Sequence, residues 1–202
     1  MLTNKGVFIT GASGGLGSRI ALEFARKGCN LYLTGQNEEK LLSLVKEIRR
    51  EAEMCKNIFF KTGNLEDPQQ LSSIISDAQN KIGDIDILVN CAGVFIVKPL
   101  EDTEDTDFDK SFNLNVKVPF VLCREFVKSM AKNKWGRIIN IGSSSSYNGF
   151  KETSVYCASK HALLGLTRSL HDEYSHKNVR GFCFSPGSIK TEMGKKVKNQ
   201  DF

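Results

Sequence analysis

Thr10-Gly11-Ala12-Ser13-Gly14-Gly15-Leu16-Gly17 joins a short apolar run to an amphipathic stretch, and this junction decides the fold. The run over residues 7–10 predicts a buried strand, and the apolar stripe over residues 16–25 predicts a helix. Glycines at such a junction let the backbone turn tightly, approach a pyrophosphate and bring the helix against the strand. The helix N-terminus then offers free N–H groups and a partial positive charge to phosphates. The junction therefore predicts a nucleotide-binding turn, with a purely structural turn as the alternative.

The glycines of this turn fit two spacings equally well. Gly11, Gly15 and Gly17 give Thr-Gly-x-x-x-Gly-x-Gly, whereas Gly11, Gly14 and Gly17 give Thr-Gly-x-x-Gly-x-x-Gly. Neither spacing is Gly-x-Gly-x-x-Gly, so the placement between a strand and a helix carries the prediction.

The alternation of short apolar runs and longer amphipathic stretches continues along the chain. Because the runs are continuous, they predict parallel strands that are covered on both faces. The six predicted strands are residues 7–10, 31–34, 58–61, 85–90, 138–141 and 179–185. The predicted helices carry apolar stripes over residues 16–25, 41–48, 71–78 and 155–170. Asp67 as N-cap and Pro68 at the first helical position predict the start of the third helix.

Strands that alternate with helices predict an α/β fold, a doubly wound parallel sheet of the Rossmann type. Right-handed crossovers with a reversal in the middle give the strand order 3-2-1-4-5-6. A ligand is then expected at the C-terminal ends of the strands, where the order reverses. No linker or repeat divides the chain, so residues 1–202 are expected to form a single dinucleotide-binding and catalytic domain. An α/β barrel needs about eight such units, for which the chain is too short.

The composition excludes several classes of protein. Apolar residues make up 40% of the chain and charged residues 25%, which excludes disordered and collagen-like chains. The apolar runs are too short to span a bilayer, and the N-terminus has no apolar signal region. We therefore expect a cytoplasmic protein with no membrane partner. The net charge of +5 suits a phosphate-bearing cofactor or an acidic carrier protein, but the scattered basic residues do not favour nucleic acid.

The six cysteines lie at positions 29, 55, 91, 123, 157 and 183, and no pair has Cys-x-x-Cys spacing. The three histidines do not cluster with them in the sequence, so no metal site is expected. Because no secretory signal is present, the thiols are expected to be reduced.

Motifs after the later predicted strands occur in a fixed order. Asn90-Cys91-Ala92-Gly93 follows the fourth strand, Ser143 the fifth, and Pro186-Gly187-Ser188-Ile189-Lys190-Thr191 the sixth. Asn115 precedes the fifth strand, and Tyr156-Cys157-Ala158-Ser159-Lys160 opens the last helix. Together with the glycine-rich turn, this order resembles the short-chain dehydrogenase/reductase family over nearly the whole chain. The resemblance implies an NAD(P)H-dependent oxidoreductase that interconverts a carbonyl and a secondary alcohol.

Two tyrosines have a lysine four residues later. Tyr147 lies in Tyr-Asn-Gly-Phe-Lys, where Gly149 disfavours a helix, whereas Tyr156 and Lys160 lie in a strongly helical run and share a face. Ser143 precedes Tyr156 by the serine-to-tyrosine spacing of the family. We therefore assign the motif to Tyr156, and we expect Tyr147 in a loop that borders the substrate pocket.

The resemblance implies four catalytic residues. A free tyrosine has a pKa of about 10, and a lysine ammonium one helical turn away favours the phenolate. Tyr156 is expected to exchange a proton with the substrate oxygen, and Lys160 to lower the pKa of Tyr156 and bind the nicotinamide ribose. Ser143 is expected to hydrogen-bond the substrate oxygen. Asn115, which fits the pattern of the family better than Asn113, is expected to fix the active-site helix and hold a water.

The resemblance also implies a cofactor site. Asn90 is expected mainly to tie neighbouring strands together, and Asn64 stands where the family usually has an aspartate near adenine. The expected cofactor-binding residues are Gly11, Ser13, Gly14, Gly15, Leu16, Gly17, Gln36, Asn64, Leu65, Asn90, Ala92, Gly93, Tyr156, Lys160, Pro186, Gly187, Ile189 and Thr191.

The residues after the second predicted strand bear on the choice between NAD and NADP. An NAD site has a carboxylate there for the ribose hydroxyls, and an NADP site has arginine or lysine for the 2′-phosphate. Here Gly35 stands where the acid would be, and Gln36 stands where NADP-preferring relatives often carry arginine. Because no carboxylate repels the phosphate and Thr34, Gln36 and Asn37 can donate hydrogen bonds to it, we expect NADP(H) to be favoured over NAD(H).

The chain stops sooner after Pro186-Gly187 than is usual in the family. A seventh strand and a final helix are therefore expected to be missing, through truncation or because this is a short form. An uncovered sixth strand would expose an edge unless it is partnered, which leaves a homo-oligomer open. The expected substrate is a small carbonyl or alcohol, with a carrier-protein thioester as a candidate. A non-catalytic dinucleotide-binding sensor or scaffold is the alternative, whereas a sugar-nucleotide epimerase needs a C-terminal domain for which no room remains.

Overall fold

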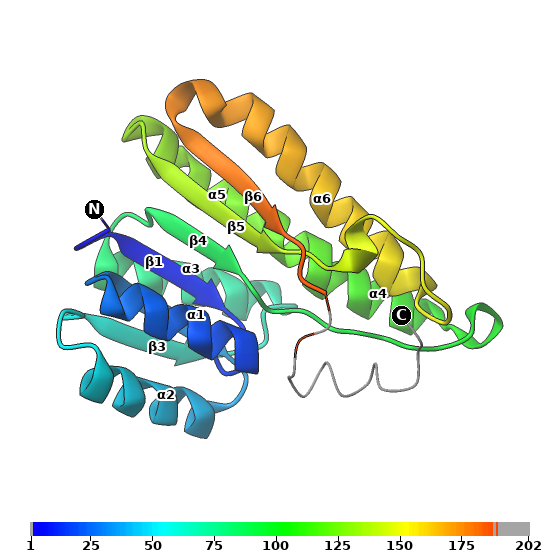
Figure 1. The fold of residues 1–202 in the computed structure, drawn as a ribbon, viewed down its shortest axis with the longest axis horizontal. Helices are drawn as coiled ribbons and strands as arrows, with labels where there is room; N and C mark the ends of the chain where they lie inside the picture. The colour runs from blue at the N-terminus through cyan, green and yellow to red at the C-terminus, as the bar shows by residue number, and fades with distance from the viewer. Residues whose placement is uncertain (1, 188, 190–202) are drawn as a thin grey trace.

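Residues 2–187 and 189 are described by the computed structural model, and their strands form a six-stranded parallel sheet (Figure 1). The strand order is β3-β2-β1-β4-β5-β6, which confirms the predicted order. The strands are β1 (Gly6–Thr10), β2 (Asn30–Gly35), β3 (Ile58–Thr62), β4 (Ile87–Asn90), β5 (Gly136–Ile141) and β6 (Val179–Phe184). A seventh strand is not found within these residues.

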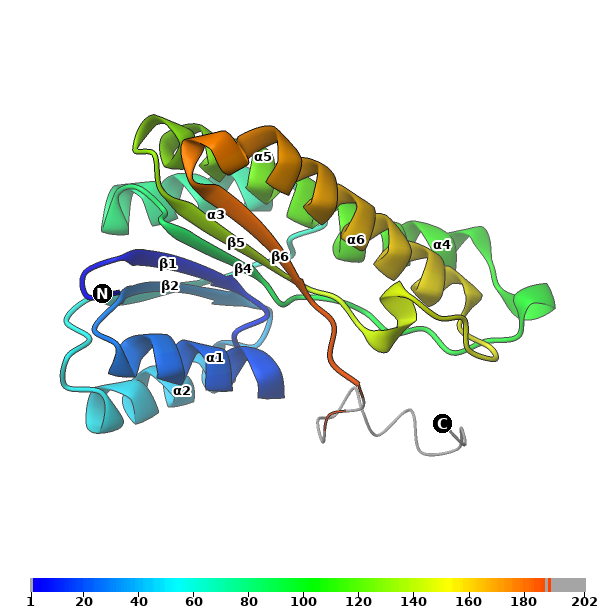
Figure 2. The same ribbon diagram turned by 45° about the horizontal axis from the view of Figure 1, so that its top comes forward.

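Helices cover both faces of the sheet (Figure 2). The face that carries the first two helices has α1 (Gly15–Arg26) and α2 (Glu38–Glu51). The other face has α3 (Pro68–Ile82), α5 (Val118–Lys132) and α6 (Ser154–Tyr174). The remaining elements are α4 (Asp105–Phe112), a π-helical turn (Asn113–Lys117) and short 3-10 turns at Leu100–Asp102, Ser144–Ser146 and Ser175–Lys177. This layering explains why the strands are apolar on both faces.

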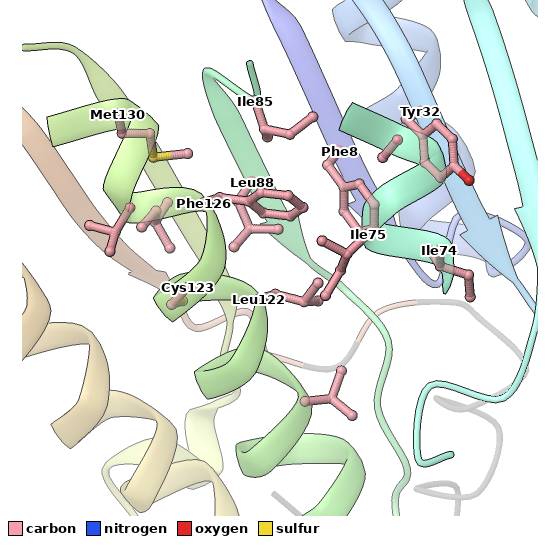
Figure 3. Close-up of a cluster of buried hydrophobic side chains, with 14 of the residues drawn as sticks. Phe8, Tyr32, Ile74, Ile75, Ile85, Leu88, Leu122, Cys123, Phe126 and Met130 are labelled. Carbon is pink, nitrogen blue, oxygen red and sulfur yellow. The ribbon is translucent and has the colours of Figure 1, made fainter. Parts of the chain in front are cut away.

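Successive residues of β1 point into two separate cores. Val7 packs toward α1 and α2, whereas Phe8 packs toward α3 and α5. The Phe8 ring stacks on Tyr32 of β2 with centroids 5.4 Å apart, and its centroid lies 5.1 Å from that of Phe126 in α5 (Figure 3). The buried Tyr32 hydroxyl donates to the carboxylate of Asp77 in α3 at 2.6 Å. The Tyr32 hydroxyl, although it lies in an apolar core, therefore has a hydrogen-bond partner.

Strand boundaries differ from the prediction by one or two residues, and β4 and β6 are shorter than expected. β4 begins at Ile87, two residues later than expected, because its pairing with β1 starts at Ile87 opposite Val7. The preceding Asp86 uses its carboxylate to accept the Gly6 N–H at 2.9 Å and the Lys5 ammonium at 2.7 Å. β6 ends one residue earlier than expected, where its pairing with β5 stops.

The segment between β4 and β5 contains helices that the apolar pattern did not predict. α4 is rich in acidic residues and buries only Ser111, so its sequence shows no apolar stripe like those of the other helices. Pro119 lies in the first two positions of α5, where a missing N–H is tolerated. The π-helical turn before it contains Asn115, and such turns frequently occur at functional sites.

The N-terminal ends of the strands carry a cluster of charged groups around Trp135, which directly precedes β5. The Lys5 ammonium lies 4.2 Å from the centroid of the Trp135 ring, and the Arg137 guanidinium lies 4.6 Å from it. Lys5 also pairs with Asp86 at 2.7 Å. The cluster ties the chain before β1 to the starts of β4 and β5.

None of the helices formed by the described residues is long and apolar enough to cross a membrane. The same residues contain no group of three His, Cys, Asp or Glu side chains that could hold a metal ion. All six cysteines are free thiols.

Candidate active site

The C-terminal ends of the six parallel strands bring the expected site residues to one edge of the sheet (Figure 1). The glycine-rich turn follows β1, Gln36 follows β2 and Asn64 follows β3. On the other side of β1, Gly93 follows β4, Ser143 follows β5 and Pro186 follows β6. The strand order reverses between β1 and β4, so these two groups flank the place where a doubly wound sheet binds its ligand.

The glycine-rich turn is shaped by close approaches that leave no room for side chains. Gly11 has a φ of +64°, and a Cβ there would lie 2.7 Å from the Ala92 nitrogen. A Cβ on Gly17 would lie 2.3 Å from the Gly11 carbonyl oxygen. No side chain caps α1, and its first turn contains no acidic residue, so its positive end can bind a pyrophosphate. The expected contact residues from this turn and the start of α1 are Gly11, Ser13, Gly14, Gly15, Leu16 and Gly17.

Thr10, the last residue of β1, clamps this turn to the turn after β4. Its buried hydroxyl accepts the N–H groups of Cys91 and Ala92, each at 3.0 Å. The two turns that are expected to contact a dinucleotide are therefore joined by one side chain. Sequence reasoning quoted Thr10 as the start of the glycine motif but gave it no role. Its place at the end of the strand was the available signal, because a hydroxyl there can reach the neighbouring strand.

Tyr156 and Lys160 lie one turn apart near the start of α6, and both are buried, with 7% and 6% of their surface exposed. The Ser143 side chain interacts with the Tyr156 phenol and favours its ionised form. The Lys160 ammonium lies 5.6 Å from the centroid of the Tyr156 ring and donates to the Ile141 carbonyl oxygen at 2.8 Å. The structure therefore brings the phenol, the hydroxyl and the ammonium together. Tyr147, by contrast, is 54% exposed.

Burial is the largest influence on the ionisation of Tyr156 and Lys160. It raises the pKa of Tyr156, and the interaction with Ser143 acts in the opposite direction. It lowers the pKa of Lys160 to about 8, because burying a charged amine is unfavourable. The expected lowering of the Tyr156 pKa by Lys160 is not found in this structure, where burial dominates and the Lys160 ammonium is directed to the Ile141 carbonyl oxygen.

Phe95 is a neighbour of Tyr156 that sequence reasoning missed. The two rings meet edge to face, with centroids 4.6 Å apart and an interplanar angle of 73°. Phe95 belongs to the chain after β4, whereas Tyr156 belongs to α6, so this contact restricts the orientation of the phenol. Its only signal in the sequence is its position two residues after Gly93.

Asn115 lies in the π-helical turn and is fully buried. Its amide oxygen accepts the Val94 N–H at 2.9 Å, and its amide nitrogen donates to the Val94 carbonyl oxygen at 3.0 Å. Asn115 thus clamps the chain that follows β4. Asn113 instead lines a cavity of about 360 Å³ between α3 and α5. The structure therefore places Asn115, rather than Asn113, beside the candidate site.

Asn90 ties strands together, as expected. Its amide nitrogen donates to the side-chain oxygen of Asn140 in β5 at 2.7 Å. Asn140 donates in turn to the hydroxyl of Thr167 in α6 at 2.8 Å, and all three residues are buried. This polar chain connects β4 and β5 to the helix that carries Tyr156.

The residues after β2 and β3 are those at which the adenosine end of the cofactor was expected. A Cβ on Gly35 would lie 2.5 Å from the Ser13 hydroxyl oxygen, so the end of β2 packs closely against the glycine-rich turn. Gln36 is exposed, whereas Leu65 is buried. The side-chain oxygen of Asn64 accepts the backbone N–H two residues later at 3.1 Å. Asn64 therefore uses part of its hydrogen-bonding capacity to close a turn.

The chain after β6 is held to the turn after β5. The Ser144 N–H donates to the Pro186 carbonyl oxygen at 3.0 Å. Gly187 is exposed and Ile189 is half-buried. Thr191, the remaining expected contact, lies outside the described residues.

Comparison with known proteins agrees with this arrangement. Residues 5–201 match the family model described as short chain dehydrogenase. The chain is 38% identical over 199 residues to the 3-oxoacyl-[acyl-carrier-protein] reductase FabG of Rickettsia conorii, which covers 98% of this chain and 78% of that protein. It superposes on levodione reductase with a TM-score of 0.91 and 26% identity, over 98% of this chain and 76% of that one. It superposes on a blue fluorescent protein from a metagenomic library, in complex with NADPH, with a TM-score of 0.88 and 32% identity, over 95% of this chain and 77% of that one.

The chain belongs to the short-chain dehydrogenase family. It is an NAD(P)-dependent oxidoreductase that acts between carbonyl and alcohol groups. The glycine-rich turn, with its close backbone approaches and the uncapped start of α1, fits the dinucleotide that this family uses.

Proposed function

We propose that this chain reduces a carbonyl group to a secondary alcohol with NADPH, reversibly, and that Tyr156 exchanges the proton with the substrate oxygen. The observation that carries the proposal is that the half-buried Ser143, after β5, lies beside the buried Tyr156 and Lys160 at the start of α6. Burial raises the pKa of Tyr156, which keeps the phenol protonated near neutral pH. A proton donor to a developing alkoxide needs this protonation state.

The other residues act through position and charge. Ser143, whose oxygen accepts the Ser145 N–H at 3.1 Å, donates to the substrate oxygen as negative charge develops there. Lys160 binds the nicotinamide ribose through its ammonium and favours the phenolate of Tyr156 once the proton has moved. Asn115 holds the chain after β4 and positions a water in the proton relay. The bound dinucleotide supplies the hydride.

The cofactor proposal is NADP(H) rather than NAD(H). No carboxylate stands at Gly35, and the exposed Gln36 can donate to a 2′-phosphate. The adenosine lies along Asn64 and Leu65, and its ribose approaches the backbone at Ala92 and Gly93. The nicotinamide lies at the chain after β6, with Pro186, Gly187 and Ile189 as its contacts.

The proposed substrate class is a 3-oxoacyl thioester, carried by a small molecule or by an acidic carrier protein. Support comes from the relative of Rickettsia conorii, which is named a 3-oxoacyl-[acyl-carrier-protein] reductase. The net charge of +5 is of the sign that favours an acidic carrier. We propose the cytoplasm as the compartment, because the six free thiols are suited to reducing conditions.

Tyr156→Phe tests the catalytic assignment. Removing the phenol oxygen eliminates the proton donor, so turnover of NADPH with acetoacetyl thioesters is expected to fall by roughly 10²–10⁴-fold. NADPH affinity, measured by calorimetry, is expected to stay within about twofold because the ring and Lys160 remain. Tyr174→Phe, at the opposite end of α6 from Tyr156, is the matched control and is expected to keep its turnover.

Unchanged turnover in Tyr156→Phe would refute the role of Tyr156. A wild-type protein that binds NADPH but oxidises it with no carbonyl in a broad panel would instead favour the non-catalytic sensor or scaffold.

A further inference from the structure

The chain that follows β4 contacts the phenol ring of Tyr156 through one aromatic side chain. Phe95 in this chain is 9% exposed, and Tyr156 near the start of α6 is 7% exposed. Their rings meet edge to face, with centroids 4.6 Å apart and an interplanar angle of 73°. Such a contact is directional, because the positive edge of one ring meets the negative face of the other. The two rings therefore hold each other in one relative orientation.

Phe95 is held in place by hydrogen bonds on both sides of it along the chain. The Asn115 amide oxygen accepts the Val94 N–H at 2.9 Å, and its amide nitrogen donates to the Val94 carbonyl oxygen at 3.0 Å. Three residues after Phe95, the Lys98 N–H donates to the carbonyl oxygen of Glu152 at 2.7 Å, just before α6 begins. Neither contact involves the phenol, so Phe95 is a fixed support against which the phenol ring packs.

Phe95 differs in kind from the other described groups that face the Tyr156 phenol. Ser143, after β5, favours the ionised form of the phenol, whereas the Cys157 thiol in α6 opposes that form. The Lys160 ammonium, also in α6, lies 5.6 Å from the centroid of the Tyr156 ring. Phe95 has neither a charge nor a hydrogen-bonding group, so it acts on the phenol by burying it. Burial raises the pKa of Tyr156 and is the largest influence on it.

We propose that Phe95 is a positioning residue, whose apolar ring fixes the orientation of the Tyr156 phenol and favours its role as proton donor over its role as proton acceptor. The inference rests on the proposed function, which assigns proton exchange to Tyr156. Phe95 has no group that can exchange a proton, so it acts through Tyr156. A site built in this way favours carbonyl reduction at neutral pH and confines alcohol oxidation, which needs the phenolate, to higher pH.

Phe95→Leu tests the orientation of the phenol, because leucine keeps most of the apolar volume but has no aromatic ring. The kcat for reduction of an acetoacetyl thioester is expected to fall by up to about tenfold, the equivalent of one edge-to-face contact. The KM for NADPH should stay within about twofold. In the reverse direction, oxidation of the 3-hydroxybutyryl thioester has an acid limb in its pH profile, set by ionisation of the phenol. This limb should stay within about 0.3 pH unit of the wild type, because position 95 remains apolar.

Phe95→Ala tests the burial of the phenol, because it removes the apolar volume as well as the ring. Bulk water then stabilises the phenolate, and the acid limb of alcohol oxidation should move to lower pH by about 0.5–1 unit. Carbon-13 NMR of labelled tyrosine measures the same ionisation without turnover, with the Tyr156 signal assigned by its absence in Tyr156→Phe. At about pH 10, the ordinary pKa of tyrosine, this signal should show more ionisation in Phe95→Ala than in the wild type. Phe95→Val, with a smaller shift in the same direction, gives the decision if Phe95→Ala does not fold.

Phe126→Leu is the matched control. Phe126 in α5 is also a buried ring that contacts another ring, that of Phe8, with centroids 5.1 Å apart (Figure 3). Its loss is expected to lower the free energy of unfolding and to leave kcat and the acid limb unchanged.

The readouts separate failure of this inference from failure of the proposed function. A wild-type kcat in Phe95→Leu would overturn the role of Phe95 in orienting the phenol. An acid limb and a tyrosine signal that both match the wild type in Phe95→Ala would overturn its role in favouring the proton donor. A wild-type protein without turnover would refute the proposed function, whereas the NMR comparison would still decide whether Phe95 controls the ionisation of Tyr156.

Discussion

Gly35 and Ser13 are the single residues on which the proposed preference for NADP(H) depends. Gly35 ends β2, and a Cβ there would lie 2.5 Å from the Ser13 hydroxyl oxygen. A carboxylate at this place is the usual means of binding the ribose hydroxyls of NAD. The glycine therefore removes both the negative charge and the side chain, and Gln36 becomes the next side chain that can meet a 2′-phosphate.

Gly35→Asp tests this reading of the cofactor site. The wild-type protein is expected to bind NADPH at least about tenfold more tightly than NADH, the equivalent of one charge-assisted hydrogen bond. The added carboxylate would repel the 2′-phosphate and is expected to reduce this preference. Gly165→Asp, on the exposed side of α6 where a Cβ has nothing within 4 Å, should leave it unchanged. Calorimetric titration gives the dissociation constant of each cofactor for each variant. NADH binding as tightly as NADPH in the wild type would contradict the proposal.

At this scale the sequence could separate Tyr156 from Tyr147, because the residues around each one favour a helix and a loop respectively. The exposures of 7% and 54% agree with that separation. The raised pKa of Tyr156 could not be predicted, because it depends on burial under groups such as Phe95 that come from another part of the chain. The pKa of a buried group depends on the side chains packed around it, and a sequence motif does not predict that packing.

At the scale of the elements, two threonines at the ends of neighbouring strands have opposite roles. Thr10 ends β1, and its hydroxyl accepts two backbone N–H groups from the turn after β4, each at 3.0 Å. Thr34 lies near the end of β2, and its equally buried hydroxyl oxygen has no hydrogen-bond partner within the described residues. The Thr10 hydroxyl therefore joins two elements, whereas the Thr34 hydroxyl is buried without a hydrogen bond to offset its desolvation.

Substitution of each threonine by valine should reveal this difference. Thr10→Val leaves two buried N–H groups without a partner and is expected to lower the free energy of unfolding by about 2 kcal/mol. Thr34→Val replaces an unpaired hydroxyl by a methyl group and is expected to leave that free energy unchanged or to raise it. Urea unfolding at pH 7 measures both, and equal losses in the two variants would show that the Thr10 contacts contribute nothing.

The elements themselves were predictable where their apolar patterns were strong. The stripes over residues 41–48 and 71–78 correspond to α2 and α3, and the prediction that Asp67 caps α3 is confirmed by its contacts with Gln69 and Gln70. α4 and the π-helical turn were not predicted, because α4 buries a single residue and a π-helical turn has no distinct apolar spacing. The position of Asn115 in that turn was therefore visible only in the structure.

For the whole molecule, the sheet order and the location of the site followed from the sequence because parallel strands place all their C-terminal ends at one edge. The apolar runs predicted the strands, and the order of the motifs predicted which strand ends carry the candidate site. β6 is an edge strand of the sheet, as the predicted order implies, and Phe182 and Phe184 in it are 46% and 56% exposed. Hydrogen bonds such as those of Thr10 and Asn115 could not be predicted, since they join segments far apart in the chain.

The free energy of unfolding of the whole molecule should fall at alkaline pH under reducing conditions. Burial raises the pKa of Cys29 to about 11 and that of Cys123 to about 12, whereas an unfolded thiol ionises near about 8.5. Above that pH the unfolded state loses protons first, so stability falls between about pH 8.5 and the folded pKa. Lys160, whose folded pKa of about 8 lies below its unfolded value, contributes in the opposite direction.

Cys29→Ala and Cys123→Ala isolate the thiol contributions. Between pH 7.5 and pH 9.5, the free energy of unfolding of each variant is expected to fall by about 1 kcal/mol less than that of the wild type. This holds whatever the stability of the variant at pH 7.5. Urea unfolding at the two pH values gives the difference. A loss as large as that of wild type in both variants would mean that these thiols do not control the alkaline behaviour.

The setting of Trp135 gives the molecule a built-in optical reporter. It is the single tryptophan of the chain, and it is enclosed by Lys5 and Arg137 at the base of the strands, at the opposite end from the glycine-rich turn. Its emission therefore follows the attachment of the first residues to the base of the sheet. Reduced nicotinamide has its own emission and would fluoresce at the other end. Unfolding of the chain and binding of the reduced cofactor can therefore be followed separately in one sample, at two emission wavelengths.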